Sequence, residues 1–169
     1  MNVYDLTVPQ LIKMLSNVDR WLVAAIAHAD RKKYDVNNLL KLRLAPDQFA
    51  FDQQVQTVCD NAKLMVARLA GKDAPAHPDG ETTFEQLRGR VAAVLGYLAG
   101  FTPDDFAGAE DRKISLPWMD GKWMRGDEYV AQFALANFYF HVMTTYAILR
   151  HNGVELGKRE FIGGVPMRS

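Results

Sequence analysis

The stretch from Tyr129 to Leu149 carries no formal charge, and it constrains the fold more than any other feature of the sequence. A run of this length is sufficient to cross a bilayer as a helix. It also contains amide, imidazole and hydroxyl side chains, namely Gln132, Asn137, His141, Thr144 and Thr145. Because the chain has no second segment of this kind, we expect a central helix of a water-soluble bundle and not a membrane span.

Apolar residues spaced three and four apart predict three more helices. The first begins near Thr7, with Pro9 in the first turn, where a missing backbone N–H costs little. The second covers residues 51–70, and Gly71 follows as a left-handed stop.

The third and fourth helices have recognisable ends. Thr82 and Glu85 are spaced as a capping box that opens the third helix, which runs to Gly100. Asp127 is a good cap for the fourth helix, where an acidic group meets the positive end of the helix dipole. Cations in the last turn followed by Gly153 predict where this helix ends.

The connections between these helices are long for a simple bundle. A short helical turn is expected at residues 36–40. Asp120 and Gly121 predict a two-residue turn in a small β-hairpin between the third and fourth helices, with Pro117 on an edge strand. No linker divides the chain, so residues 1–169 are interpreted as one domain.

The overall composition excludes some classes of protein. Twenty basic residues balance twenty acidic ones without a basic cluster, which argues against nucleic-acid binding. The single cysteine, Cys59, cannot form an intrachain disulfide, and the first residues lack the pattern of a secretion signal. We therefore expect a cytoplasmic protein with neither nucleic-acid nor membrane partners.

Three segments carry a family resemblance: "YDLTVPQLIKML", "RLAPDQFAFDQQVQTVCDNAK" and "FALANFYFHVMTTYAILRHNGVELGKREFIG". Together they resemble a bacterial domain-of-unknown-function family of the DinB/YfiT-like superfamily. The resemblance covers nearly the whole chain. It implies an all-α four-helix bundle in up-down-down-up order, often dimeric. The superfamily includes proposed metal-dependent enzymes, among them thiol-dependent transferases and isomerases.

The same resemblance implies where a metal would bind. Superfamily members with a metal site supply one histidine from the second helix and a His-x-x-x-His pair from the fourth. Here His141 matches one member of the pair, but Asn137 and Thr145 stand four residues away, and the second helix has no histidine. The full triad is therefore absent. Asp60 is the second-helix carboxylate that could join His141 around a divalent transition metal (Zn, Ni or Fe), although helical spacing favours a solvated acid paired with Lys63 or Lys41.

His141 allows three interpretations: a buried histidine bonded to its neighbours, a residue of a functional pocket, or a metal ligand. Helical spacing points it into the bundle, flanked by Asn137, Thr144 and Thr145. We expect His141, Asn137 and Thr145 to form a ligand-binding set. Gln54 is one of several polar residues on the second helix that could also reach a pocket.

Aromatic residues lie around nearly the whole circumference of the fourth helix, so it must be covered on most sides. A homodimer through this helix is expected; alternatively the hairpin, with Trp118 and Trp123, and the C-terminal tail, through Leu156 and Phe161, cover it.

The function predicted from these observations is a small-ligand-binding or dimeric structural module with His141 as the polar anchor of a cavity. The alternative is a metal-assisted or acid–base transferase or hydrolase that acts on a small molecule.

Overall fold

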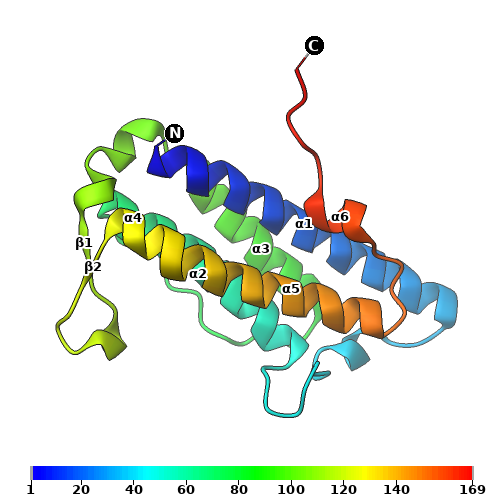
Figure 1. Cartoon of the computed structure of the whole chain (residues 1–169). Helices are drawn as coiled ribbons and strands as arrows, with labels where there is room; N and C mark the ends of the chain where they lie inside the picture. The colour runs from blue at the N-terminus through cyan, green and yellow to red at the C-terminus, as the bar shows by residue number, and fades with distance from the viewer. Residues whose placement is uncertain (1, 169) are drawn as a thin grey trace.

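Four long helical segments form the body of the protein, for which the computed structural model describes residues 2–168 (Figure 1). The α-helices are α1 (Val3–Lys32), α2 (Phe51–Ala70), α3 (Phe84–Ala99), α4 (Gly126–Glu128), α5 (Leu135–His151) and α6 (Lys158–Ile162). A π-helical segment, Tyr129–Ala134, joins α4 to α5 in one continuous rod. Short 3₁₀ turns occur at Val36–Leu39, Pro103–Phe106, Ala109–Asp111 and Pro117–Met119, and the strands are β1 (Lys113–Ile114) and β2 (Met124–Arg125). None of these helices combines the length and the hydropathy needed to cross a membrane.

The helices follow the up-down-down-up order. At the starts of α2 and α3, the rings of Phe51 and Phe84 stack 5.2 Å apart, so these two helices run in the same direction. The end of α2 meets the start of the fourth rod, where Arg68 Nη1 donates to the Tyr129 hydroxyl over 3.1 Å, so these two segments are antiparallel. Figure 1 shows α1 and α5 running in the same direction, opposite to α2 and α3. The core lies between the four rods.

The first helix begins earlier than the sequence predicts. Asn2 caps it by accepting a hydrogen bond from the Asp5 backbone N–H over 2.9 Å, and the helix starts at Val3. Thr7 is therefore an interior residue, and its hydroxyl donates to the Val3 carbonyl over 2.7 Å. Pro9 lies inside the helix instead of in its first turn. Asn2 is a favourable capping residue, and its bond to Asp5 adds a turn before Thr7.

The capping box of α3 is displaced by one residue from the predicted pair. Thr83 Oγ1 accepts from the Gln86 N–H over 3.2 Å, and Gln86 Oε1 accepts from the Thr82 N–H over 2.7 Å. Both Thr82 and Thr83 can cap, and both Glu85 and Gln86 can return the bond, so spacing alone could not choose between the two registers. The predicted bounds of α2, including the left-handed Gly71 with φ 65°, are confirmed.

The predicted hairpin exists, but its geometry differs. Asp120 and Gly121 have φ values of 49° and 79°, and the Lys122 N–H closes the turn on the Met119 carbonyl over 2.9 Å. The strands do not flank this turn, because β1 and β2 pair only at residues 113–114 and 124–125, across an irregular loop.

The C-terminal tail packs back on α1, as predicted. Leu156 is buried, and the Phe161 ring stacks on Trp21 at 5.7 Å. The loop between β1 and β2 covers another part of the fourth rod, because the centroids of the Trp118 and Phe133 rings lie 5.6 Å apart.

A buried ion network ties the connection between α2 and α3 to both helices. The Arg90 side chain is 1% exposed, and it contacts Asp60 at 2.9 Å, Asp79 at 3.0 Å and Glu81 at 3.1 Å. Lys63, also buried, reaches the same Asp60 oxygen at 2.8 Å. Burial by itself would raise the pKa of Glu81, but hydrogen bonds from Gln56 and Arg90 bring that pKa below its ordinary value.

We predict that Arg90→Leu lowers the free energy of unfolding by about 3–5 kcal/mol, because it leaves several carboxylates without their buried cation. Arg88→Leu is the matched control: Arg88 also pairs with a carboxylate, Asp19, but its side chain is 34% exposed. The control should lose at most about 1 kcal/mol. Urea unfolding measures both values, and equal losses would contradict a structural role for the Arg90 network.

Candidate functional site

A pocket of about 240 Å³ opens beside His141, between α5 and the loop that precedes α2. Its lining residues come from three elements: Asp47, Gln48 and Phe49 from the loop, Gln54 from α2, and Phe140 and His141 from α5. The loop is held against the helices by backbone hydrogen bonds, including Phe51 N–H to Leu42 carbonyl at 2.9 Å. The pocket is therefore formed where this hydrogen-bonded loop leads into α2 and faces α5.

A chain of hydrogen bonds fixes the orientation of the imidazole. Gln54 Nε2 donates to the Phe49 carbonyl over 3.2 Å, which leaves the amide oxygen facing His141. His141 Nδ1 lies 2.7 Å from this Gln54 Oε1. An amide oxygen can only accept, so Nδ1 carries the proton and Nε2 keeps its lone pair. No hydrogen-bond partner for Nε2 occurs within residues 2–168.

The protonation of His141 follows from its surroundings. The side chain is partly buried, and burial lowers its pKa below the ordinary value of about 6.5. Desolvation disfavours the imidazolium, so the ring is neutral near pH 7. The site thus presents a neutral imidazole with a free acceptor nitrogen.

Two aromatic rings pack against the His141 imidazole. Phe49 stacks on the imidazole at 6.1 Å with an interplanar angle of 20°, and Phe140 meets it edge to face at 5.1 Å. Phe49 and Phe140 are 49% and 52% exposed, so about half of each ring remains open to a binding partner. Flat rings with this exposure suit a flat ligand.

A second polar side chain, Gln48, lines the same pocket. Gln48 Oε1 is buried and has no hydrogen-bond partner among the described residues. A buried polar atom without a partner is costly unless something else satisfies it. Asp47 adds an exposed carboxylate at the pocket. The six residues that line the pocket include neither Lys nor Arg.

Two residues of the sequence-predicted set lie elsewhere on α5. The Thr145 hydroxyl donates to the carbonyl of His141 over 2.8 Å and is fully buried. Asn137 is partly buried and does not line the pocket. Of the predicted set, His141 alone is in the pocket, where its partner is Gln54.

Structural roles explain the presence of Asp60 and Cys59 on α2. Asp60 pairs with Lys63 and Arg90 in the ion network between α2 and α3. Burial raises the pKa of the Cys59 thiol to about 12, as expected for an unreactive core cysteine.

The comparisons with known proteins agree with this fold. A family model described as a domain of unknown function (DUF1993) matches residues 3–162. The chain belongs to the DUF1993 family. A crystal structure of a DinB family member protein from Shewanella denitrificans is 49% identical and superimposes with a TM-score of 0.95, covering 99% of this chain and 95% of that chain. No curated protein matches the chain. The predicted DinB-like, all-α bundle is confirmed.

The donor set of this DUF1993 chain does not fit a superfamily metal site. Among residues 2–168, no group of three or more His, Cys, Asp or Glu side chains is placed to hold a metal ion. Next to His141, the second helix offers Gln54, whose amide oxygen is occupied by the Nδ1 proton. Amides and phenyl rings are poor partners for a transition metal compared with imidazole and thiolate.

Sequence reasoning missed the loop residues of the pocket. Gln54 is one of several polar residues on the second helix that could reach a pocket, and Gln48 and Phe49 lie in a connection without periodicity. The single available signal was the turn-forming Pro46-Asp47 pair just before a helix start, which predicts a turn but not what the turn covers.

We predict that the folded protein loses stability as the pH falls below about 6.5, since the unfolded chain then binds protons that folded His141 resists. The loss should level off below the folded pKa. His141→Gln should remove part of this dependence, whereas the matched control His151→Gln, at an exposed position, should not. Urea unfolding at about pH 7.5 and about pH 5.5, with NMR titration of the ring signals, checks the effect. A His141 pKa above the ordinary value would contradict it.

Proposed function

We propose that the His141 pocket binds a small, flat molecule that carries N–H or O–H donors. The observation that carries this proposal is the His141 Nε2 lone pair, which Gln54 fixes in place and which finds no protein partner within residues 2–168. Gln48 adds a second polar side chain to the pocket lining, and its buried Oε1 has no hydrogen-bond partner among the described residues.

The charge and size of the pocket narrow the class of ligand. Asp47 is the only charged residue among the lining residues, which favours a neutral or cationic ligand over an anion. The volume of about 240 Å³ lies below the usual range for drug-sized ligands, which begins near 300 Å³. A single-ring compound with amine, amide, amidine or hydroxyl groups fits these limits.

We predict that benzamidine shifts the ring NMR signals of His141 in a saturable manner and that benzoate, which has the same ring but an anionic group, does not. His141→Phe keeps an aromatic ring but removes the acceptor, and it should weaken benzamidine binding, measured for every variant by isothermal titration calorimetry, about tenfold or more. Asn137→Ala is the control on the same helix, because Asn137 does not line the pocket.

Thermal unfolding must first establish that each variant is folded. Equal shifts with benzoate, or unchanged benzamidine binding by His141→Phe, would contradict the proposal. A loss of binding in Asn137→Ala would extend the site along α5 to the residues expected from sequence.

General acid–base catalysis is a second candidate function. It is favoured by one observation: a neutral imidazole whose Nδ1 proton is held by an amide leaves Nε2 available as a base. The metal-assisted form of this hypothesis has no comparable support from the donor set. Chemical conversion of a bound donor compound, absent in His141→Phe, distinguishes catalysis from binding.

The proposed biological unit is a homodimer that uses the outer face of the fourth rod. The exposed residues on this face recur at spacings of four and three and are Gln132, Ala136, Phe140 and Met143. Phe140 and Met143 are each about half exposed, at 52% and 51%. Large apolar side chains on one helical face are typical of interface residues.

We predict that Met143→Glu converts a dimer into a monomer, because a charge at the centre of an apolar interface is desolvated without a partner. Val23→Glu, at a 44% exposed apolar position on α1, is the matched control. Sedimentation velocity over a concentration series measures the mass. A parent protein that stays monomeric throughout the series would disprove the dimer.

A further inference from the structure

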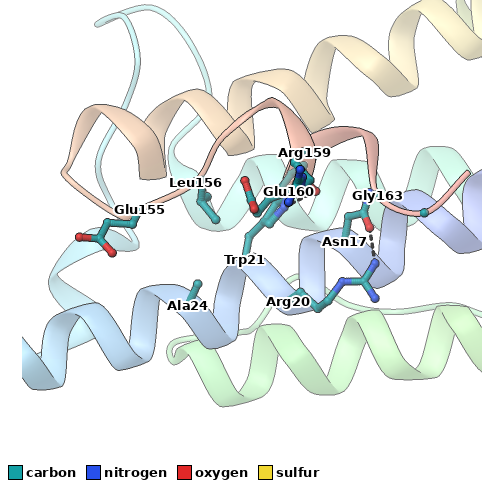
Figure 2. A pocket seen from close by; sticks show the side chains of 10 residues that line it. Asn17, Arg20, Trp21, Ala24, Glu155, Leu156, Arg159, Glu160 and Gly163 are labelled. Carbon is teal, nitrogen blue, oxygen red and sulfur yellow. Dashed lines mark hydrogen bonds between the residues drawn. The ribbon is translucent and has the colours of Figure 1, made fainter.

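A larger pocket, of about 460 Å³, lies between α1 and the C-terminal segment 155–164, away from the residues that line the His141 pocket. Figure 2 shows Trp21 rising from α1 toward α6, with Arg20 and Asn17 beside it and the tail passing overhead. Nothing in the proposed function uses this region.

The walls of this pocket are fixed by hydrogen bonds between α1 and the tail. Trp21 Nε1 donates to the Glu160 carbonyl over 3.2 Å, and Asn17 Nδ2 donates to the Phe161 carbonyl over 2.9 Å. Gly163 has φ 70° and lies so close that a Cβ there would be 2.7 Å from Asn17 Oδ1. The tail is therefore seated on buried polar groups of α1, and the pocket exists before a ligand arrives.

The middle of the pocket is apolar. Trp21 and Leu156 are 1% and 6% exposed, so each presents only a narrow apolar edge to the pocket, and the partly buried Ala24 adds a methyl group. This lining can accept a hydrocarbon or ring portion of a ligand and remove it from water.

The charged groups are distributed unevenly. Arg20 and Arg159 line the pocket, and within residues 2–168 neither forms an ion pair with a carboxylate. Arg20 donates to Asn17 Oδ1, which holds its guanidinium near Gly163. The Glu160 carboxylate accepts the Gly157 N–H over 2.7 Å, which directs one of its oxygens to the start of α6. Figure 2 shows the remaining acid, Glu155, at the far end of the pocket beyond Leu156.

We infer that this pocket binds a small molecule in which an oxyanion, a carboxylate or a phosphate, is carried on an apolar body. The oxyanion binds to Arg20 and Arg159, whose planar guanidinium groups match it in a bidentate manner. The apolar body lies along Trp21 and Leu156. This site differs from the His141 pocket in place and in having arginines in its lining, so each proposal is tested independently of the other.

The test uses octanoate as the probe and Trp21 as the reporter. Trp118→Phe/Trp123→Phe removes the other two tryptophans, which are 62% and 48% exposed in the loop between β1 and β2. In this background, octanoate should change the Trp21 emission in a saturable manner. Octylammonium, with the same chain and the opposite charge, should bind at least about tenfold more weakly.

Two variants locate the site. Arg20→Gln/Arg159→Gln should weaken octanoate binding about tenfold or more, while Arg31→Gln/Lys32→Gln, which removes two cations elsewhere on α1, should not. Ala24→Phe should fill the pocket and abolish binding without removing a charge. Thermal unfolding checks that the variants are folded.

Octyl phosphate distinguishes the two oxyanion sources: tighter binding than octanoate assigns a phosphate, and weaker binding assigns a carboxylate. The proposal is overturned if neither binds, if octylammonium binds as well as octanoate, or if octanoate still binds to folded Ala24→Phe.

Discussion

The need to cover an uncharged, aromatic-rich helix organises the rest of this structure. The rod from Gly126 to His151 is packed against α1 and α2, but two other helices cannot enclose a cylinder. Less regular segments cover what is left: the tail brings Phe161 against Tyr146, and the loop after β1 brings Trp118 against Phe133. One of the two pockets described above lies where the loop before α2 meets α5, and the other lies where the C-terminal segment, including α6, meets α1.

The same burial determines how polar groups are used. His141 lies on the most apolar rod of the molecule, and its Nδ1 proton needs an acceptor there. The acceptor comes from another helix, Gln54, and that amide is in turn held by the carbonyl of Phe49. A single chain of bonds therefore links α5, α2 and the loop before α2. The Arg90 network does the same between α2, α3 and the connection that joins them.

The sequence predicted regular elements well and their partners poorly. The bounds of α2 were correct because apolar periodicity and Gly71 agree, whereas the cap of α3 was displaced because neighbouring residues have equivalent chemistry. His141 was identified from its polarity in an apolar run. Asn137 and Thr145 were grouped with it because an ideal helix places them on adjacent faces, but a threonine hydroxyl in a helix bonds to its own backbone. Loop residues such as Phe49 have no periodicity to interpret.

Gln54 determines which hydrogen-bonding groups His141 can present. It is the second-helix residue that bonds to His141. A histidine at this position could offer a ring nitrogen to an ion, whereas the amide oxygen accepts the His141 Nδ1 proton. This polar contact links α2 and α5 and leaves Nε2 without a partner within residues 2–168. A single lone pair between two half-exposed phenyl rings is a poor cage for an ion but a good anchor for a flat hydrogen-bond donor.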